Sequence, residues 1–310
     1  MTSYGRRTRR TFVGIALAGA LTAGLASCGA GTGDAKPDGR LSGALDGIPQ
    51  DAAGGYLTYW DVKESRRLLG KDKELYGTLD GYGIPELVQS RYESDPARTA
   101  HGFDETDVDT SVQLAAQSGR LTGRFDVAAI TAALKKRGWT EDKTDGGALL
   151  RDKPAEVAVS ASVRSSSFGQ GGGVPPLVAP ERSVADEPAY QAVVGCIGED
   201  TYHATFYGKD PKSRLPGLTL FAIGARAGDD GASRERLCAL TQSAEGARGV
   251  ADVLKAKTAK GERFAGATVE VGGGKTPMVT MEWANGTASG LRPGSQKQTG
   301  ELPRLLMPPR

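Results

Sequence analysis

The chain has 310 residues, which is enough for one large or two small domains. Charged residues make up 25% and hydrophobic residues 38% of it, a balance typical of a globular chain with its own core. The formal net charge of +2 excludes a strongly basic nucleic-acid-binding protein. With two histidines and three cysteines there is little material for a metal site, so we expect neither a metal nor a cofactor.

The first 27 residues have the three zones of an export signal. A head with four arginines precedes an apolar run over 12–25, and the small residues Ala26 and Ser27 follow. This order is typical of a secretory signal peptide. The run is rich in glycine and alanine and is shorter than the roughly 20 apolar residues that a spanning helix needs. We therefore predict a signal peptide over residues 1–27.

Leu25-Ala26-Ser27-Cys28 stands directly after the apolar run. This tetrapeptide resembles the lipobox of bacterial lipoproteins. The resemblance implies that Cys28 is the first mature residue, that it carries diacylglycerol and palmitate, and that the protein is anchored on the extracytoplasmic face of the cell membrane. Two or more acyl chains hold a protein stably at a bilayer. The alternative is an ordinary secreted protein in which Cys28 is buried or disulfide-bonded.

Residues 8–13 resemble a twin-arginine export motif, with the pair Arg9 and Arg10, one spacer and then Phe12. Gly14 stands where the motif usually has a lysine. The resemblance implies that the protein crosses the membrane already folded, and the alternative is a basic head used by the general export route. Removal of residues 1–27 takes away four arginines and no acidic residue, so the formal charge changes from +2 to −2. A nucleic-acid partner is therefore not expected.

Three parts are predicted in the mature chain. Residues 28–55 have few large apolar side chains and are expected to form a flexible, lipidated tether. Residues 56–285 are expected to form the folded domain. Residues 286–310 are predicted to be mostly disordered, and the apolar residues of 302–307 are a candidate to dock on the core.

Helices and strands alternate in the first half of the domain. Tyr56–Trp60 is a predicted strand, and Asp61 can cap a helix over 62–69. Asp126 can cap a second helix over 127–137, where apolar residues recur at helical spacing. The other elements predicted here are a helix at 84–92 and strands at 112–116, 121–125, 148–151 and 156–163.

A stretch rich in serine, glycine and proline, 165–176, is predicted to be a linker that does not pack. Beyond it the elements recur as helix 187–197, strands 201–207 and 217–226, helix 233–257, and strands 267–272 and 278–284. We therefore predict an α+β fold, in which helices cover one face of an antiparallel sheet. Two similar halves, over about 56–163 and 184–285, are a further hypothesis.

Cys196 and Cys238 remain when Cys28 is lipidated, and an even number of cysteines in an exported protein predicts one disulfide. Cys196 ends one predicted helix and Cys238 begins another, so the bridge is expected to join two helices. The alternative is a redox pair or a set of metal thiolates. Neither a C-x-x-C spacing nor a neighbouring histidine supports that alternative.

Two loops have residue types that suggest chemistry. The four acids within 103–109 could supply oxygen ligands to calcium, but the pattern of an EF-hand is missing and a solvated loop is the simpler interpretation. Residues 272–276 end like a phosphate-binding loop. Val269 stands where that motif needs a glycine and Pro277 follows, so a hairpin turn is the simpler interpretation.

Two further features have a structural alternative. His203 could act as a general base, whereas a strand histidine usually faces solvent. The aromatic residues of 56–82 could line a binding groove or fill a core. They are Tyr56, Tyr59, Trp60, Tyr76 and Tyr82.

These features together predict a membrane-anchored, non-enzymatic binding or interaction module of the cell envelope. Its partners would be the membrane, through the lipid anchor, and an unidentified envelope ligand or protein. The alternative is an envelope enzyme of hydrolase type whose active site is not local in sequence. A deep pocket around His203 or the acids of 104–109 would favour the enzyme, and a shallow aromatic surface or a sheet edge would favour binding.

Overall fold

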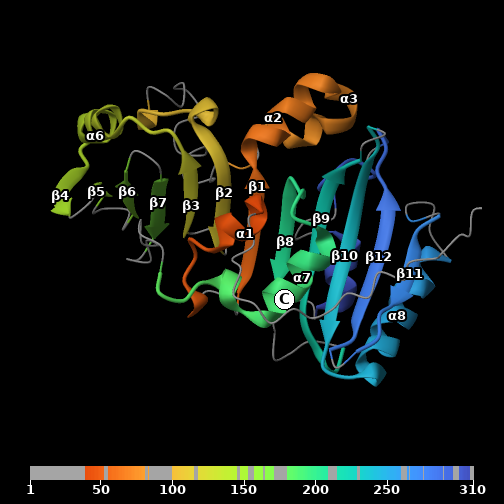
Figure 1. Cartoon of the computed structure of the whole chain (residues 1–310). Helices are drawn as coiled ribbons and strands as arrows, with labels where there is room; N and C mark the ends of the chain where they lie inside the picture. The colour runs from red at the N-terminus through yellow and green to blue at the C-terminus, as the bar shows by residue number, and fades with distance from the viewer. Residues whose placement is uncertain are drawn as a thin grey trace, which may run out of the picture. The chain divides into compact units, whose positions relative to one another are not determined.

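A single twelve-stranded sheet organises the part of the chain that the computed structural model describes (Figure 1). Every pair of neighbouring strands is antiparallel. The strand order is β11-β12-β10-β9-β8-β1-β2-β3-β7-β6-β5-β4. The described residues are 39–51, 55–80, 83, 100–114, 118–144, 147–152, 157–162, 165–170, 180–208, 215–228, 231–259, 264, 266–274, 276–288, 290–295 and 300–307.

The strands fall into two runs that meet at the centre of the sheet. The N-terminal run comprises β1 (Tyr56–Asp61), β2 (Val108–Leu114), β3 (Ser118–Gly123), β4 (Thr140–Thr144), β5 (Gly147–Asp152), β6 (Val157–Ala161) and β7 (Ser165–Gln170). The C-terminal run comprises β8 (His203–Tyr207), β9 (Leu218–Ala227), β10 (Ser233–Thr241), β11 (Thr268–Val271) and β12 (Met278–Ala284). β1 and β8 join the two runs, with Thr58 opposite Thr205 in the middle of their five residue pairs.

The helices are distributed along both runs. They include α1 (Arg40–Leu45), α2 (Val62–Lys71), α3 (Lys73–Tyr76), α6 (Val127–Lys136), α7 (Pro188–Ile197), α8 (Ala244–Thr258) and α9 (Glu301–Leu306). In each half a helix precedes three successive strands, a second helix follows them, and a later strand returns beside the third. These units are α1-β1-β2-β3-α6-β7 and α7-β8-β9-β10-α8-β12. The first unit also contains α2 and α3 between β1 and β2 and the strands β4, β5 and β6 before β7, and the second contains β11 before β12.

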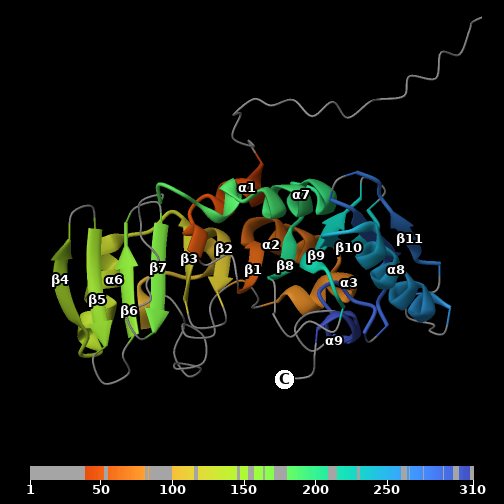
Figure 2. The ribbon, with the colours of Figure 1, turned by 90° about the horizontal axis from the view of Figure 1, so that it is seen from below.

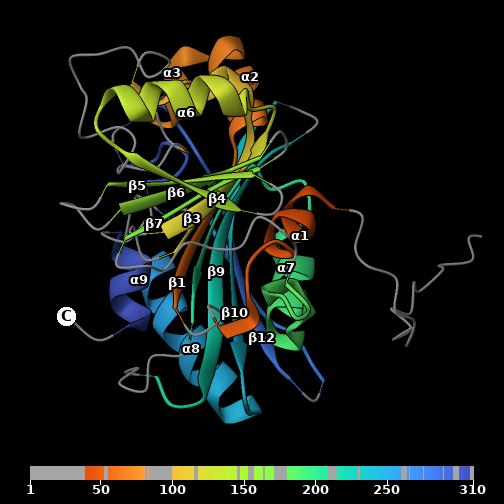
Figure 3. The same cartoon turned by 90° about the vertical axis from the view of Figure 1, so that its left-hand side faces the viewer.

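Helices lie on both faces of the sheet. One face at the centre packs on α1 and α7, and the opposite face packs on α8 and α9 in the C-terminal half (Figures 2 and 3). In the N-terminal half, that opposite face packs on α2 and α6. The α+β class and the antiparallel sheet are confirmed, whereas the prediction that helices cover one face is wrong. Central strands such as β9 are buried on both faces, and each apolar face needs its own cover.

The helix caps predicted from the sequence are present in the structure. The Asp61 carboxylate accepts a hydrogen bond from the Glu64 backbone at 2.8 Å, and the Asp126 carboxylate accepts one from Ala129 at 3.0 Å. These are the predicted caps of α2 and α6. Gly138 follows α6 with φ of +88°, a conformation that favours glycine. The predicted helix at 84–92 lies outside the described residues, as do the signal peptide and Cys28.

The folded domain begins N-terminal to residue 56, where the sequence predicts its boundary. α1 lies within the segment that the sequence predicts to be a tether, and Leu41, Leu45 and Ile48 are fully buried. The Asp61 carboxylate also accepts a hydrogen bond from Arg40 at 2.6 Å, which ties α1 to the end of β1. At the other end of the chain, α9 docks on the core through buried Leu302 and Leu306.

Two further predictions are wrong. The stretch predicted to be an unpacked linker contains β7, which pairs with both β3 and β6 and whose Ser167 and Phe168 are buried. The predicted helix over 233–257 is strand β10 followed by α8. Apolar residues of Leu237–Leu240 alternate between two clusters on opposite faces of the sheet, so burial on both sides favours the strand here.

Candidate functional site

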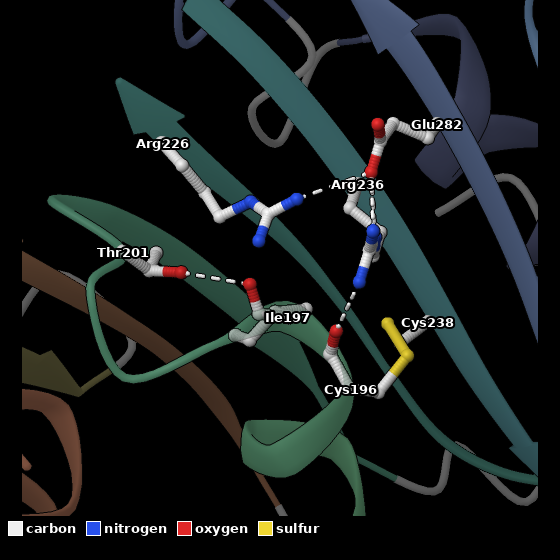
Figure 4. Close-up of a disulfide and its surroundings, with 7 residues drawn as sticks. All are labelled: Cys196, Ile197, Thr201, Arg226, Arg236, Cys238 and Glu282. Atoms are coloured by element: carbon white, nitrogen blue, oxygen red, sulfur yellow. Dashed lines mark hydrogen bonds and ion pairs between the residues drawn. A yellow bond between two sulfur atoms is a disulfide. The ribbon is translucent and has the colours of Figure 1, made fainter. Parts of the chain in front are cut away.

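The predicted disulfide is present, but it joins a helix to a strand (Figure 4). Cys196 lies near the end of α7 and Cys238 in the middle of β10, with Cα atoms 6.2 Å apart. Arg236 donates to the carbonyl of Cys196 at 3.0 Å and to Glu282 at 2.8 Å. A guanidinium at the C-terminal end of a helix satisfies a carbonyl that lacks an intrahelical partner. Arg226 also donates a hydrogen bond to Glu282, at 3.2 Å. The disulfide and the Arg236 hydrogen bond to Cys196 together hold α7 against the sheet.

His203 lies in the interior rather than on the solvent side of its strand. Its side chain is 2% exposed, and its ring lies against that of Trp60 with centroids 3.9 Å apart. The hydroxyl of Thr205 lies 3.3 Å from its Nε2 atom. The expectation of a solvent-facing histidine is therefore wrong.

A belt of polar side chains crosses the centre of the sheet beside this pair. It includes Thr58, Ser111, Thr205 and Tyr207, none more than 7% exposed. The hydroxyls of Ser111 and Tyr207 have no hydrogen-bond partner within the described structure. This belt belongs to the interior, and we assign it no ligand.

The acids of 104–109 are engaged in local structure. The Asp104 carboxylate accepts from the backbone of Thr106 at 2.8 Å, and that of Asp107 accepts from the backbone of Asp104 at 3.0 Å. This reciprocal arrangement caps a short 3₁₀ turn, Glu105–Asp107. Among the described residues no cluster of three or more histidine, cysteine, aspartate or glutamate side chains could hold a metal ion.

The remaining sequence candidates have structural roles as well. The glycine run at 272–274 leads from β11 toward β12, and Gly272 donates from its backbone to the carbonyl of Met278 at 2.8 Å. The hairpin interpretation is therefore confirmed. Tyr59, Trp60 and Tyr76 are buried in the core, so the aromatic cluster is no open groove, while Tyr82 lies outside the described residues.

The two edges of the sheet differ sharply. At the β4 edge, Glu141 pairs with Lys135 at 3.2 Å and Asp142 pairs with Arg151 at 2.9 Å. Charged side chains at an edge discourage pairing with another strand. At the β11 edge, Glu270 is the single charged side chain of the strand, and Val271, at 46%, is the large apolar side chain that is exposed among the described residues. No local pattern in the sequence marks this edge, because residues 268–271 become an edge strand only through the strand order.

The ladder between β11 and β12 determines which backbone groups of β11 face outward. The bond from Gly272 to Met278 makes these two residues a hydrogen-bonded pair. Hydrogen-bonded pairs alternate along an antiparallel ladder, so Glu270 and Thr268 bond inward to β12. The N–H and C=O groups of Val269 and Val271 therefore point away from the sheet. They can accept a further strand.

Comparisons with known proteins identify no family for this chain, and they find a distant structural neighbour. No protein-family model matches the chain, and no curated protein matches it. The crystal form I structure of TP0453 is similar over 78% of this chain and 93% of that chain, at 12% sequence identity and a TM-score of 0.44. Within the described residues, no helix has both the length and the apolar character needed to cross a membrane.

Proposed function

We propose that this chain is a lipid-anchored, extracytoplasmic interaction module that binds an extended segment of another protein along β11. The observation that carries the proposal is the difference between the two sheet edges. Ion pairs occupy the β4 edge, whereas β11 presents outward backbone groups and exposed Val271. Addition of a strand to such an edge is a general mode of peptide recognition.

The location of the module rests on two supports. The first is the lipobox resemblance at Cys28, with the preceding signal peptide. The second is the disulfide between Cys196 and Cys238, because such bonds persist in oxidising compartments outside the cytoplasm.

Anchoring is tested by replacing the proposed lipidation site. Cys28→Ser in the full chain is expected to move the protein from the membrane fraction to the soluble extracytoplasmic fraction and to remove the acyl mass from its N-terminus. A variant with both Cys196→Ser and Cys238→Ser serves as the control, because it removes the two disulfide-bonded cysteines together, leaves no new free thiol and keeps the anchor. Unchanged distribution and N-terminal mass in the Cys28→Ser protein would contradict the anchor.

Binding at the edge is tested with a pool of short extended peptides and the purified mature chain. Binding should perturb the amide resonances of β11 and should be lost in Val271→Pro, which removes an outward N–H. The N–H of Val271 makes no bond to β12, so this substitution spares the ladder. Val271→Ala keeps the N–H and should retain measurable binding. Binding that Val271→Pro leaves intact would place the interaction elsewhere.

A further inference from the structure

The side chains of β11 divide between the two faces of the sheet. Val269 and Val271 stand opposite Met281 and Val279, which belong to the apolar cluster under α8. Glu270 points to the other face, opposite Thr280, and is exposed. A strand that pairs with β11 therefore meets an apolar surface on one face and a carboxylate on the other.

The ladder also determines how closely an incoming strand approaches Glu270. An antiparallel partner would bond to the outward groups of Val269 and Val271 and would place one residue directly opposite Glu270. That position is a non-hydrogen-bonded pair, in which Cα atoms lie only about 4.5 Å apart and side chains are closest. A cationic side chain there is stabilising, and an acidic one is destabilising.

The same geometry argues against a second copy of this chain as the occupant. Two antiparallel β11 strands that use both valines would place Glu270 opposite its own copy, which opposes two like charges. A register centred on Val269 would instead use the N–H of Ala267, which already donates to the carbonyl of Phe264 at 3.0 Å.

We infer that the segment bound by β11 carries a lysine or arginine between two β-branched or other apolar residues, in an antiparallel orientation. This inference rests on the proposed function and specifies its partner. The cation lies opposite Glu270, and the two apolar side chains extend the cluster beside Val269 and Val271. The four outward backbone groups bind any extended segment, and Glu270 selects among segments by charge.

Two synthetic heptapeptides test the inference on the purified mature chain. The sequences STVKVTS and STVEVTS, capped at both ends, differ only in the central charge. The lysine peptide is expected to bind about tenfold more tightly than the glutamate peptide at low salt, with smaller discrimination at high salt. Amide shifts of Val269 and Val271, followed up to millimolar peptide, measure both affinities.

Charge reversal provides the matched variant. Glu270→Lys changes an exposed side chain and should reverse the preference, so that the glutamate peptide binds more tightly. Val271→Pro should abolish binding of both peptides, and Val271→Ala should weaken both while keeping their order. Retained amide spectra show that each variant is folded.

The outcomes separate this inference from the proposed function. Equal binding of both peptides, lost in Val271→Pro, would overturn the charge selection and leave edge recognition standing. If neither peptide shifts the β11 resonances, both the selection and strand addition at this edge fail. Concentration-dependent self-association through β11, abolished by Val271→Pro, would identify a second copy as the occupant and overturn the inference.

Discussion

The two halves of the sheet share an order of elements but end differently. Apart from α2 and α3, which lie between β1 and β2, each half has a helix, three strands that are neighbours in the sheet, a second helix and a returning strand, and β1 and β8 meet at the centre. Beyond its returning strand, the N-terminal half continues through β6 and β5 to the charged strand β4. The C-terminal half ends one strand after β12, at β11.

The two halves are therefore similar in their buried interior and differ at the outermost strands of the sheet. In both halves one face of the sheet packs on a single helix, α1 or α7, and the opposite face packs on helices that follow in the chain. The outermost strands face solvent, and their side chains determine whether the sheet can accept another strand. Differences in outward recognition are therefore concentrated at the two edges.

The free energy of unfolding is expected to fall most steeply in alkaline solution, where buried tyrosines of both halves ionise on unfolding. Burial is the main cause that raises the pKa of Tyr59 in the N-terminal half and of Tyr190, Tyr202 and Tyr207 in the C-terminal half. A phenol whose pKa is higher in the folded state stabilises the fold fully below its unfolded pKa of about 10, and this stability is lost as pH rises further.

Each of these tyrosines should lower the free energy of unfolding by about 1.4 kcal/mol per pH unit above about pH 10. Denaturant unfolding across this range, followed with tyrosinate absorbance, checks the expectation. Tyr207→Phe should reduce the slope. Ionisation of all tyrosines near pH 10 while the fold persists would contradict it.

The second test removes the disulfide, which is a feature of the C-terminal half. The bridge spans 42 residues of sequence, and closure of such a loop stabilises a fold by about 4 kcal/mol in the chain-entropy account. A variant with Cys196→Ala and Cys238→Ala should lose about that free energy of unfolding in urea. A reducing agent should produce the same loss in the unaltered chain and none in the variant.

A matched pair of core substitutions compares the halves directly. Leu134 of α6 is 2% exposed and Leu254 of α8 is fully buried. Leu134→Ala and Leu254→Ala should each cost about 3 kcal/mol, because each leaves a cavity under an equivalent helix. Both should shift one common unfolding transition, since the two halves share a continuous sheet. Two separate transitions would show that the halves unfold independently.

The caps of α2 and α6 provide a smaller contrast. Asp61 caps α2 and also binds Arg40 while its side chain is 5% exposed, whereas Asp126 caps α6 at the surface. Asp61→Ala should cost about 2 kcal/mol and Asp126→Ala about 1 kcal/mol. Thermal unfolding of the two variants measures the difference. Equal losses would mean that the Arg40 contact contributes nothing.

Proline substitutions in β11 should change the free energy of unfolding only slightly, by an amount that depends on which backbone N–H they remove. Val271→Pro should change the free energy of unfolding by less than about 1 kcal/mol, because no ladder bond depends on this N–H. Glu270→Pro should cost more, since the N–H of residue 270 bonds inward to β12. Equal destabilisation by both substitutions would contradict the assignment of outward and inward groups.

The features that depend on residues close together in the sequence were predicted correctly. The caps of α2 and α6, the strand at Tyr56–Asp61 and the hairpin after β11 all depend on residues within a few positions. The disulfide was also predicted, from cysteine number and export. Its pairing of a helix with a strand was missed because β10 was predicted to be helical.

The errors share a physical cause, which is burial by distant segments. β7 contains serine and glycine, but its neighbours β3 and β6 pair with its backbone and override its composition. α1 has only six residues, yet Leu41 and Leu45 are fully buried in the cluster that includes residues of α7. The candidate site depends on strand order, which no local pattern along the chain records.

The five residue pairs between β1 and β8 limit how this protein can respond to a partner. Binding proteins that close like a clamshell need a pliable crossing between lobes, and here the crossing is itself a hydrogen-bonded ladder. A segment captured at β11 would therefore bind to a rigid, preformed strand edge, and binding would require little conformational change of the sheet. Affinity for the segment would then depend on the side chains of β11 rather than on the free energy of closing two lobes.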